Sequence, residues 1–186
     1  MQQRTRRRGF IIGLMAVGLL AATVFTTGPA QAVTANGPYY AAPAWDQKLP
    51  ATTRFVVLLD WNGEAVLDRE TGLVWERSPD PTTATWSDAR FACMGRATGN
   101  RRGWRLPSVH ELASLVDPSV APGPTLPVGH PFTNVLSDVY WSATSDAENP
   151  TFAWNMGFDD GFVGNSVKTF IFQVWCVRGG MNAEAY

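Results

Sequence analysis

The chain has 186 residues, of which 45% are hydrophobic, with 15 basic and 16 acidic side chains. This length and composition suit one globular domain. The near-neutral balance argues against a nucleic-acid partner, which would require a basic surface.

The first 32 residues are typical of a secretory signal peptide. An arginine cluster precedes an uncharged apolar stretch from Phe10 to Phe25, and Ala30-Gln31-Ala32 forms a small-residue cleavage site. The pair Arg7-Arg8 also fits a twin-arginine signal, so the sequence leaves the Sec and twin-arginine routes open. An uncleaved anchor is the less favoured alternative, because the apolar stretch is shorter than the roughly 20 residues that a membrane span needs. Only such an anchor would bring the protein to a membrane.

We therefore predict an exported protein, either periplasmic or secreted. Loss of residues 1–32 removes four of the 15 basic residues and none of the 16 acidic ones, so the net charge becomes 11 − 16 = −5. A ligand with negative charge would then need a local basic cluster, because the bulk charge repels it.

The two cysteines, Cys93 and Cys176, favour a disulfide in an oxidising compartment. The bridge would close a loop of about 80 residues and contribute about 4–5 kcal/mol in the chain-entropy model. Two separate buried thiols are the less favoured alternative. The two histidines, His110 and His130, are too far apart in sequence from the cysteines and from each other for a zinc site, so we expect no metal centre of that kind.

The domain is expected over residues 54–180, after an extended lead-in (33–53) and before a short tail (181–186). In the first half of the domain, the sequence predicts strands at 55–59, 65–68 and 73–75, with an Asn62-Gly63 turn after the first strand. A helix is predicted from Thr85, as N-cap, to Met94, with Cys93 on its buried face. A polar loop containing Arg96, Arg101 and Arg102 follows.

The best-defined element is a helix from Ser108 to Val116. Ser108 is a favoured N-cap, and Glu111 three residues later completes a capping box. Pro118 ends the helix because it disfavours the helical conformation at Asp117. A proline-rich loop (118–131) and strands at 139–144, 152–158 and 171–177 complete an α+β domain with an antiparallel sheet.

Several motifs resemble the C-terminal domain family of the Legionella collagen-like adhesin. They occur in the family's order between Asp68 and Gly179 and comprise Thr71-Gly72-Leu73-Val74-Trp75, Trp86-Ser87-Asp88-Ala89, Gly103-Trp104-Arg105-Leu106-Pro107-Ser108, Tyr140-Trp141-Ser142-Ala143-Thr144, Phe152-Ala153-Trp154 and Cys176-Val177-Arg178. The resemblance implies a C-type-lectin-like fold, with two helices on a small twisted antiparallel sheet and long loops. It also implies carbohydrate or glycosaminoglycan binding, although this chain lacks the collagen-like repeats that would make such binding multivalent.

The hairpin in the last third of the chain offers candidate ligand-binding residues, namely Trp154, Asn155, Asp159, Asp160 and Asn165. Oxygen donors of this kind suit calcium, and an exposed tryptophan suits a sugar ring. The match to the calcium–sugar motifs of C-type lectins is poor, so we favour a core position for Trp154 and a turn at Asp159-Asp160-Gly161.

Arg101 and Arg102 are further candidates, because with Arg96 they form the main basic cluster outside the signal and could bind sulfate or carboxylate groups; a solvated loop is the favoured alternative. Most tryptophans are expected in the core, and Trp61, beside a turn, is expected to be the most exposed.

No catalytic group emerges from these patterns. Ser108, His110 and Glu111 are neighbours along one helix and cannot form a triad, and His130 has no evident partner. We therefore predict a binding or adhesion module, with a glycan or an envelope or host-surface protein as partner, in preference to a structural domain or an enzyme. We expect no cofactor, with calcium as the one weakly supported candidate.

Overall fold

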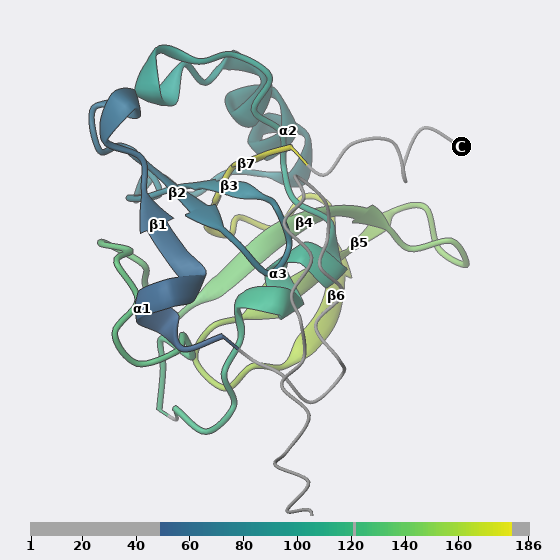
Figure 1. Cartoon of the computed structure of the whole chain (residues 1–186). Coiled ribbons are helices and arrows are strands. Elements are labelled where there is room, and N and C mark those ends of the chain that lie inside the picture. Colours follow the sequence, from purple (N-terminus) through teal and green to yellow (C-terminus); the bar gives the residue numbers. More distant parts are fainter. Residues whose placement is uncertain (1–48, 121, 180–186) are drawn as a thin grey trace, which may run out of the picture. The chain divides into compact units, whose positions relative to one another are not determined.

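The computed structural model describes residues 49–120 and 122–179 (Figure 1). The predicted signal peptide, residues 33–48 of the lead-in and the tail lie outside these residues. The helices are α1 (Ala51–Arg54), α2 (Trp86–Gly95) and α3 (Val109–Leu115), with 3-10 turns η1 (Leu59–Trp61) and η2 (Thr98–Asn100). The strands are β1 (Phe55–Val57), β2 (Ala65–Asp68), β3 (Val74–Glu76), β4 (Val139–Ser145), β5 (Phe152–Gly157), β6 (Val163–Val167) and β7 (Val177–Arg178).

The strands form two small antiparallel sheets, in the orders β1-β2-β3-β7 and β4-β5-β6. The predicted α+β class is therefore correct, but the single sheet expected from the sequence is replaced by two, and α1 is an additional helix. Within the described residues no helix is long and apolar enough to cross a membrane.

The predicted helix signals are confirmed. Thr85 caps α2 by accepting a hydrogen bond from the Asp88 amide. At α3 the Ser108 hydroxyl accepts from the Glu111 amide at 3.2 Å, while the Glu111 carboxylate accepts from the Ser108 amide at 2.8 Å. This reciprocal pair satisfies amide groups that the helix itself leaves unbonded.

The predicted last strand, 171–177, is wrong in extent, because only Val177 and Arg178 form a strand. The residues before it cross from one sheet to the other. Gln173 bridges to Tyr140 of β4, whereas Val177 pairs with Trp75 of β3 and with Arg105. A segment that changes sheets cannot keep one straight ladder of hydrogen bonds. The first strand is also shorter than predicted, because η1 follows Val57 closely.

The predicted disulfide is present. Cys93 of α2 and Cys176 of the crossing segment are joined with an S–S distance of 2.08 Å, and both side chains are fully buried. The bond ties α2 to the segment that connects the sheets. A disulfide fits a protein that is exported to an oxidising compartment.

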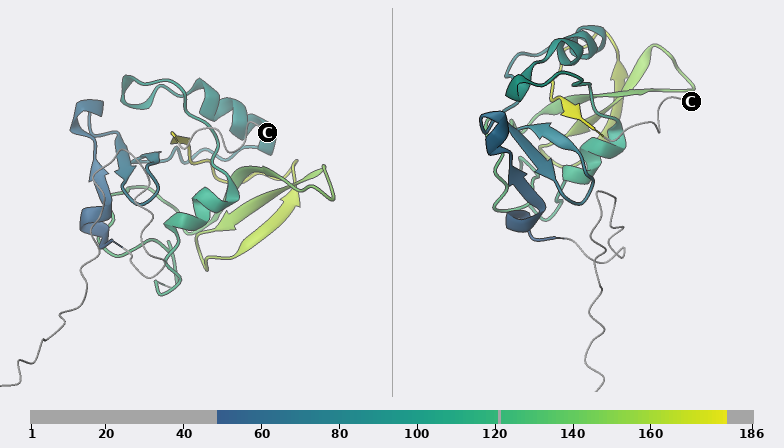
Figure 2. Two further views of the ribbon diagram at one scale, coloured as in Figure 1. Left: turned by 45° about the vertical axis from the view of Figure 1, so that its right-hand side comes forward. Right: turned by 45° about the horizontal axis from the view of Figure 1, so that its top comes forward.

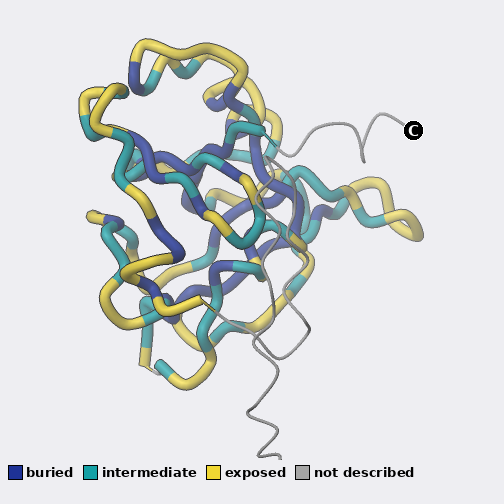
Figure 3. Tube along the Cα trace, viewed as in Figure 1, coloured by how far each residue is buried: buried dark blue, intermediate teal, exposed yellow. Residues whose placement is uncertain are grey.

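Two apolar clusters fill the interior, and the buried residues concentrate in the strands and the crossing segment (Figure 3). One cluster contains residues of β1–β3, α3 and one face of β4 and β5, and the other contains α2, the disulfide and the opposite face of those strands. As predicted, most of the tryptophans within the described residues are in the core; those at most 2% exposed are Trp75, Trp104, Trp141 and Trp175.

Candidate functional site: an arginine–tryptophan platform

The candidate residues of the β5–β6 hairpin do not form one site. Trp154 is half-buried, so the predicted core position is wrong, and it lies opposite Asn165 across the two strands. Asn155 is buried on the other face of the sheet, where its amide donates to the Ser166 hydroxyl at 3.0 Å. The side chains of Trp154 and Asn155 therefore diverge, as alternation along a strand requires.

The acidic candidates belong to the turn after β5, as the sequence analysis favoured. Asp159 and Asp160 are exposed there, and the Asp160 carboxylate accepts from the Phe162 amide at 2.8 Å. The Asn165 amide donates instead to Asp146 at 2.7 Å. Across residues 49–120 and 122–179, no group of three or more His, Cys, Asp or Glu side chains is placed to hold a metal ion.

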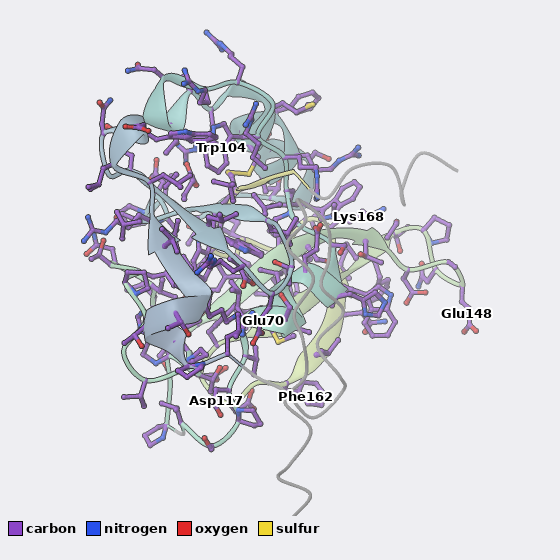
Figure 4. The ribbon with its side chains drawn as sticks, viewed as in Figure 1. Glu70, Trp104, Asp117, Glu148, Phe162 and Lys168 are labelled. Carbon is purple, nitrogen blue, oxygen red and sulfur yellow. A yellow bond between two sulfur atoms is a disulfide. The ribbon has the colours of Figure 1, made fainter. Side chains whose placement is uncertain are left out.

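The loop between α2 and α3 is held from several sides. The Arg96 guanidinium bonds to Asp80 at 3.1 and 3.2 Å, and the Thr98 hydroxyl bonds to buried Glu76 at 2.8 Å. Beneath the loop, the Trp104 indole donates to the carbonyls of Thr98 and Arg101 (Figure 4). These bonds make the loop a rigid support for the exposed residues that follow η2.

Trp61 lies directly against η2. Gly99 adopts φ +63°, and a Cβ atom at this position would lie 2.7 Å from the Trp61 Cβ, so only glycine permits this approach. The Gly99 amide donates to the Glu64 carboxylate at 2.7 Å and thereby joins the loop to the turn that carries Trp61. The predicted Asn62-Gly63 turn is confirmed, with both residues at positive φ.

Two arginines from distant parts of the chain meet on the Trp61 ring. The guanidinium carbon of Arg101 lies 5.4 Å from the ring centroid, and that of Arg178 lies 5.2 Å from it. Arg178 also donates to the carbonyl of Arg102 at 2.8 Å, which holds the three arginine residues together. We call Trp61, Arg101, Arg102 and Arg178 the platform.

Among the described arginines, three form ion pairs, whereas the platform arginines, like Arg69, Arg77 and Arg90, form none. Arg54, Arg96 and Arg105 each form an ion pair with a carboxylate. Among the described residues, no platform arginine forms one. Trp61 is half-buried, as are Trp86 and Trp154, and its ring supports guanidinium groups rather than facing solvent alone. The platform is thus a basic surface with unneutralised charge.

The sequence model of the Lcl C-terminal domain matches residues 64–178, which is more than half of the chain. The chain belongs to this family. The matched range agrees with the region in which the family motifs were recognised, and it contains every platform residue except Trp61. No curated protein matches the chain.

Sequence reasoning on this Lcl domain identified Arg101 and Arg102 but missed Arg178 as a partner for them. Arg178 was noted only as part of a family motif, and the residues that it meets lie more than 70 positions earlier. No local pattern in the chain could reveal this contact, because it depends on β7 pairing with β3 and with Arg105.

The Lcl domain has a second cation–aromatic cluster, at Trp86. Arg90 lies 4.7 Å and the Lys168 ammonium 4.1 Å from its ring centroid. The Lys168 ammonium, however, also bonds to the Ser145 hydroxyl and to the Pro150 carbonyl. These bonds attach the β4–β5 turn to the end of β6, so the Trp86 cluster has a structural role.

An open cavity of about 620 Å³ beside the loop carries charged groups that neutralise one another. Its lining includes Glu76, Asp80 and Arg96, which form a connected chain of ion pairs. Burial raises the pKa of Glu76, against the opposing effects of the Thr98 hydroxyl and Arg96. The raised pKa indicates that the cost of desolvating the ionised carboxylate exceeds the stabilisation that its hydrogen bonds and Arg96 provide.

We predict that Glu76→Gln alters how stability depends on pH. Because the folded-state pKa is raised, Glu76 contributes stability below its unfolded pKa of about 4.3, and this contribution is lost as pH rises through the folded value. The wild-type free energy of unfolding should therefore fall relative to that of the variant as the pH rises above the unfolded pKa. Urea denaturation at several pH values measures the difference, with Glu148→Gln at the exposed β4–β5 turn as the control. A constant difference would contradict the prediction.

The histidines and the capping residues do not assemble an acid–base pair. His110 is exposed on α3, between two residues that are occupied in the capping box. His130 stacks on Phe132 with ring centroids 5.8 Å apart, and burial lowers its pKa. The geometry of the platform is therefore the more informative guide to function.

Proposed function

We propose that this Lcl C-terminal domain is an exported binding module that holds acidic glycans on the platform. The observation that carries the proposal is that Arg101 and Arg178 converge on Trp61, while neither forms an ion pair with a carboxylate of the described residues. The planar guanidinium group of arginine matches the geometry of carboxylate and sulfate groups and binds them through paired hydrogen bonds.

The surroundings of the platform support such a role. Stacking on Trp61 restricts the two guanidinium groups, which reduces the entropy lost when a ligand binds. The support loop is held by Glu64, Glu76 and the Cys93–Cys176 bond, so the charges are presented on a rigid base. In a mature domain of net charge −5, a local cluster of this kind is required for an anionic ligand.

We further propose that binding needs no calcium and involves no catalysis. The oxygen donors suggested for calcium are separated, with Asn155 buried, Asn165 bonded to Asp146, and Asp160 bonded within its own turn. Ser108 and Glu111 are committed to the capping box. A C-type-lectin-like arrangement is our proposal for the fold, supported by the two main helices and the disulfide from α2 to the residue before β7.

Glycan-array binding of the mature domain, with and without calcium, tests the proposal. We expect binding to sulfated or uronate-rich glycans that is unchanged by a calcium chelator and weakens at high salt. Arg101→Ala combined with Arg178→Ala should weaken binding at least tenfold, because two charged contacts are lost. Arg69→Ala removes an exposed arginine that is not among the cations placed over the Trp61 ring, and it should leave binding unchanged.

Failure to bind any acidic glycan would overturn this function. Equal loss in the platform and Arg69 variants would show that only bulk charge matters. Far-ultraviolet circular dichroism of each variant establishes that the fold is intact. A protein of the envelope or of a host surface is the alternative partner that such a failure would favour.

A further inference from the structure

Strand β6 is the outermost strand of its sheet (Figure 2). Its only strand partner in the described part of the chain is β5, so its outer edge has unpaired backbone groups. Edge strands are usually protected by charged side chains, proline or a bulge. The sequence of β6, Val-Gly-Asn-Ser-Val, contains no charge and no proline, and its pairing with β5 has no register shift.

The direction of the free backbone groups follows from the bonds at the two ends of β6. The Gly157 amide donates to the Phe162 carbonyl, and the Lys168 amide donates to the Thr151 carbonyl. Residues 162 and 168 therefore direct their backbone groups towards β5, and alternation gives residues 164 and 166 the same direction. Val163, Asn165 and Val167 consequently direct their amide and carbonyl groups outwards.

The same three residues make the strand complementary to itself. The sequence reads almost identically about Asn165, with valine at both ends and a small residue at each intermediate position. When two such strands pair in antiparallel register about Asn165, each valine lies opposite a valine. Glycine lies opposite serine, and Asn165 lies opposite its own copy. No like charges face each other within the strand.

We propose that β6 is a homodimer interface, in which two copies of the chain pair their β6 edges antiparallel about Asn165 and join two three-stranded sheets into one. This register agrees with the direction of the free backbone groups. Residues 163, 165 and 167, whose amide and carbonyl groups face outwards, occupy the hydrogen-bonded positions of the new ladder. Such a contact is isologous and closes at two copies. The Val167 carbonyl, which accepts from the Phe170 amide, keeps a second lone pair for the ladder.

The ends of the strand add apolar contact to this arrangement. Phe162 and Lys168 lie at opposite ends of β6 (Figure 4), and Phe162 is 68% exposed. Antiparallel pairing about Asn165 places Phe162 opposite the partner's Lys168 on one face, and Val163, which is 37% exposed, opposite the partner's Val167 on the other. A dimer would also carry two platforms and could bind a polymer at two points.

Chemical cross-linking of the mature protein tests the register. In the proposed ladder the two copies of residue 165 face each other with Cα atoms about 5.5 Å apart. The two copies of residue 167 are about 13 Å apart along the strands. A short linker that joins two thiols should therefore couple Asn165→Cys to itself efficiently and couple Val167→Cys, a matched control on the same strand and face, far less. Equal coupling of both variants, or of neither, would overturn the register.

Sedimentation equilibrium over a range of concentrations tests the association itself. The wild-type protein should approach the mass of two chains. Asn165→Lys should remain folded, because its ammonium can reach Asp146 in place of the present amide bond. It should also weaken association about fivefold or more, because like charges then face each other. Mixing Asn165→Lys with Asn165→Glu should restore association between unlike chains.

Ala147→Lys adds the same charge in the exposed β4–β5 turn and should leave the mass unchanged. A wild-type protein that stays monomeric at the highest concentration would overturn the proposal. So would a dimer that Asn165→Lys does not affect. These outcomes are independent of glycan binding, so the interface and the platform can fail separately.

Discussion

Replacing Cys93 and Cys176 together with alanine should lower the free energy of unfolding by about 4–5 kcal/mol. The two cysteines are 83 positions apart, so the bond restricts a long loop in the unfolded chain. It also joins α2 to the segment that links the two sheets, so its loss should allow α2 and the support loop to open first. Urea denaturation of the double variant and of the wild type measures the change.

The same comparison after reduction of the wild type provides the control. Reduced wild-type protein and the double variant should unfold at similar urea concentrations, because both lack the bond while the small alanine side chains leave little strain. A loss below about 1 kcal/mol would show that the unfolded chain is already compact around this loop. Platform affinity should fall in parallel with stability, because Arg101 depends on the support loop.

Arg54→Ala should be the most damaging single substitution, at about 3–5 kcal/mol. The Arg54 guanidinium bonds to both oxygens of Asp68, at 2.9 and 2.8 Å, and to the Ser114 carbonyl at 2.7 Å. Asp68 is fully buried, so truncation of Arg54 leaves an uncompensated carboxylate in the interior. Thermal and urea unfolding of the variant measure the loss.

Arg69→Ala is the matched control, because Arg69 is the exposed arginine next to Asp68 and forms no ion pair among the described residues. Its effect should stay within about 0.5 kcal/mol. Arg54→Lys should recover only part of the stability, because an ammonium cannot reproduce the paired contact with Asp68. Equal effects of Arg54→Ala and Arg69→Ala would show that Asp68 finds another partner.

Local signals in the sequence were reliable wherever the interacting groups are neighbours in the chain. The capping box of Ser108 and Glu111, the Thr85 cap and the Asn62-Gly63 turn each depend on contacts within a few residues. The disulfide was also predictable, because a predicted export signal together with two cysteines leaves few alternatives. The family motifs, which are spread in a defined order, likewise survived as a match over residues 64–178.

Contacts between distant segments were decided only by the tertiary structure. Alternating apolar residues predict a strand and its buried face, but they do not say which strand lies beside it. The pattern therefore could not show that residues 171–177 cross between two sheets, nor that Arg178 meets Arg101 over Trp61. The symmetry of the β6 sequence is visible in the chain. It suggests pairing with a second copy only because β6 lies at an edge of its sheet.

The sequence by itself thus determined the family, the disulfide, the helix caps and the content of the core. The tertiary structure decided where the exposed arginines gather and which strand edge is left open. The physical reason is that helix caps, turns and buried faces are set by short-range bonds and by hydrophobic patterning. Strand neighbours and surface clusters depend instead on pairings between residues that are far apart in the chain.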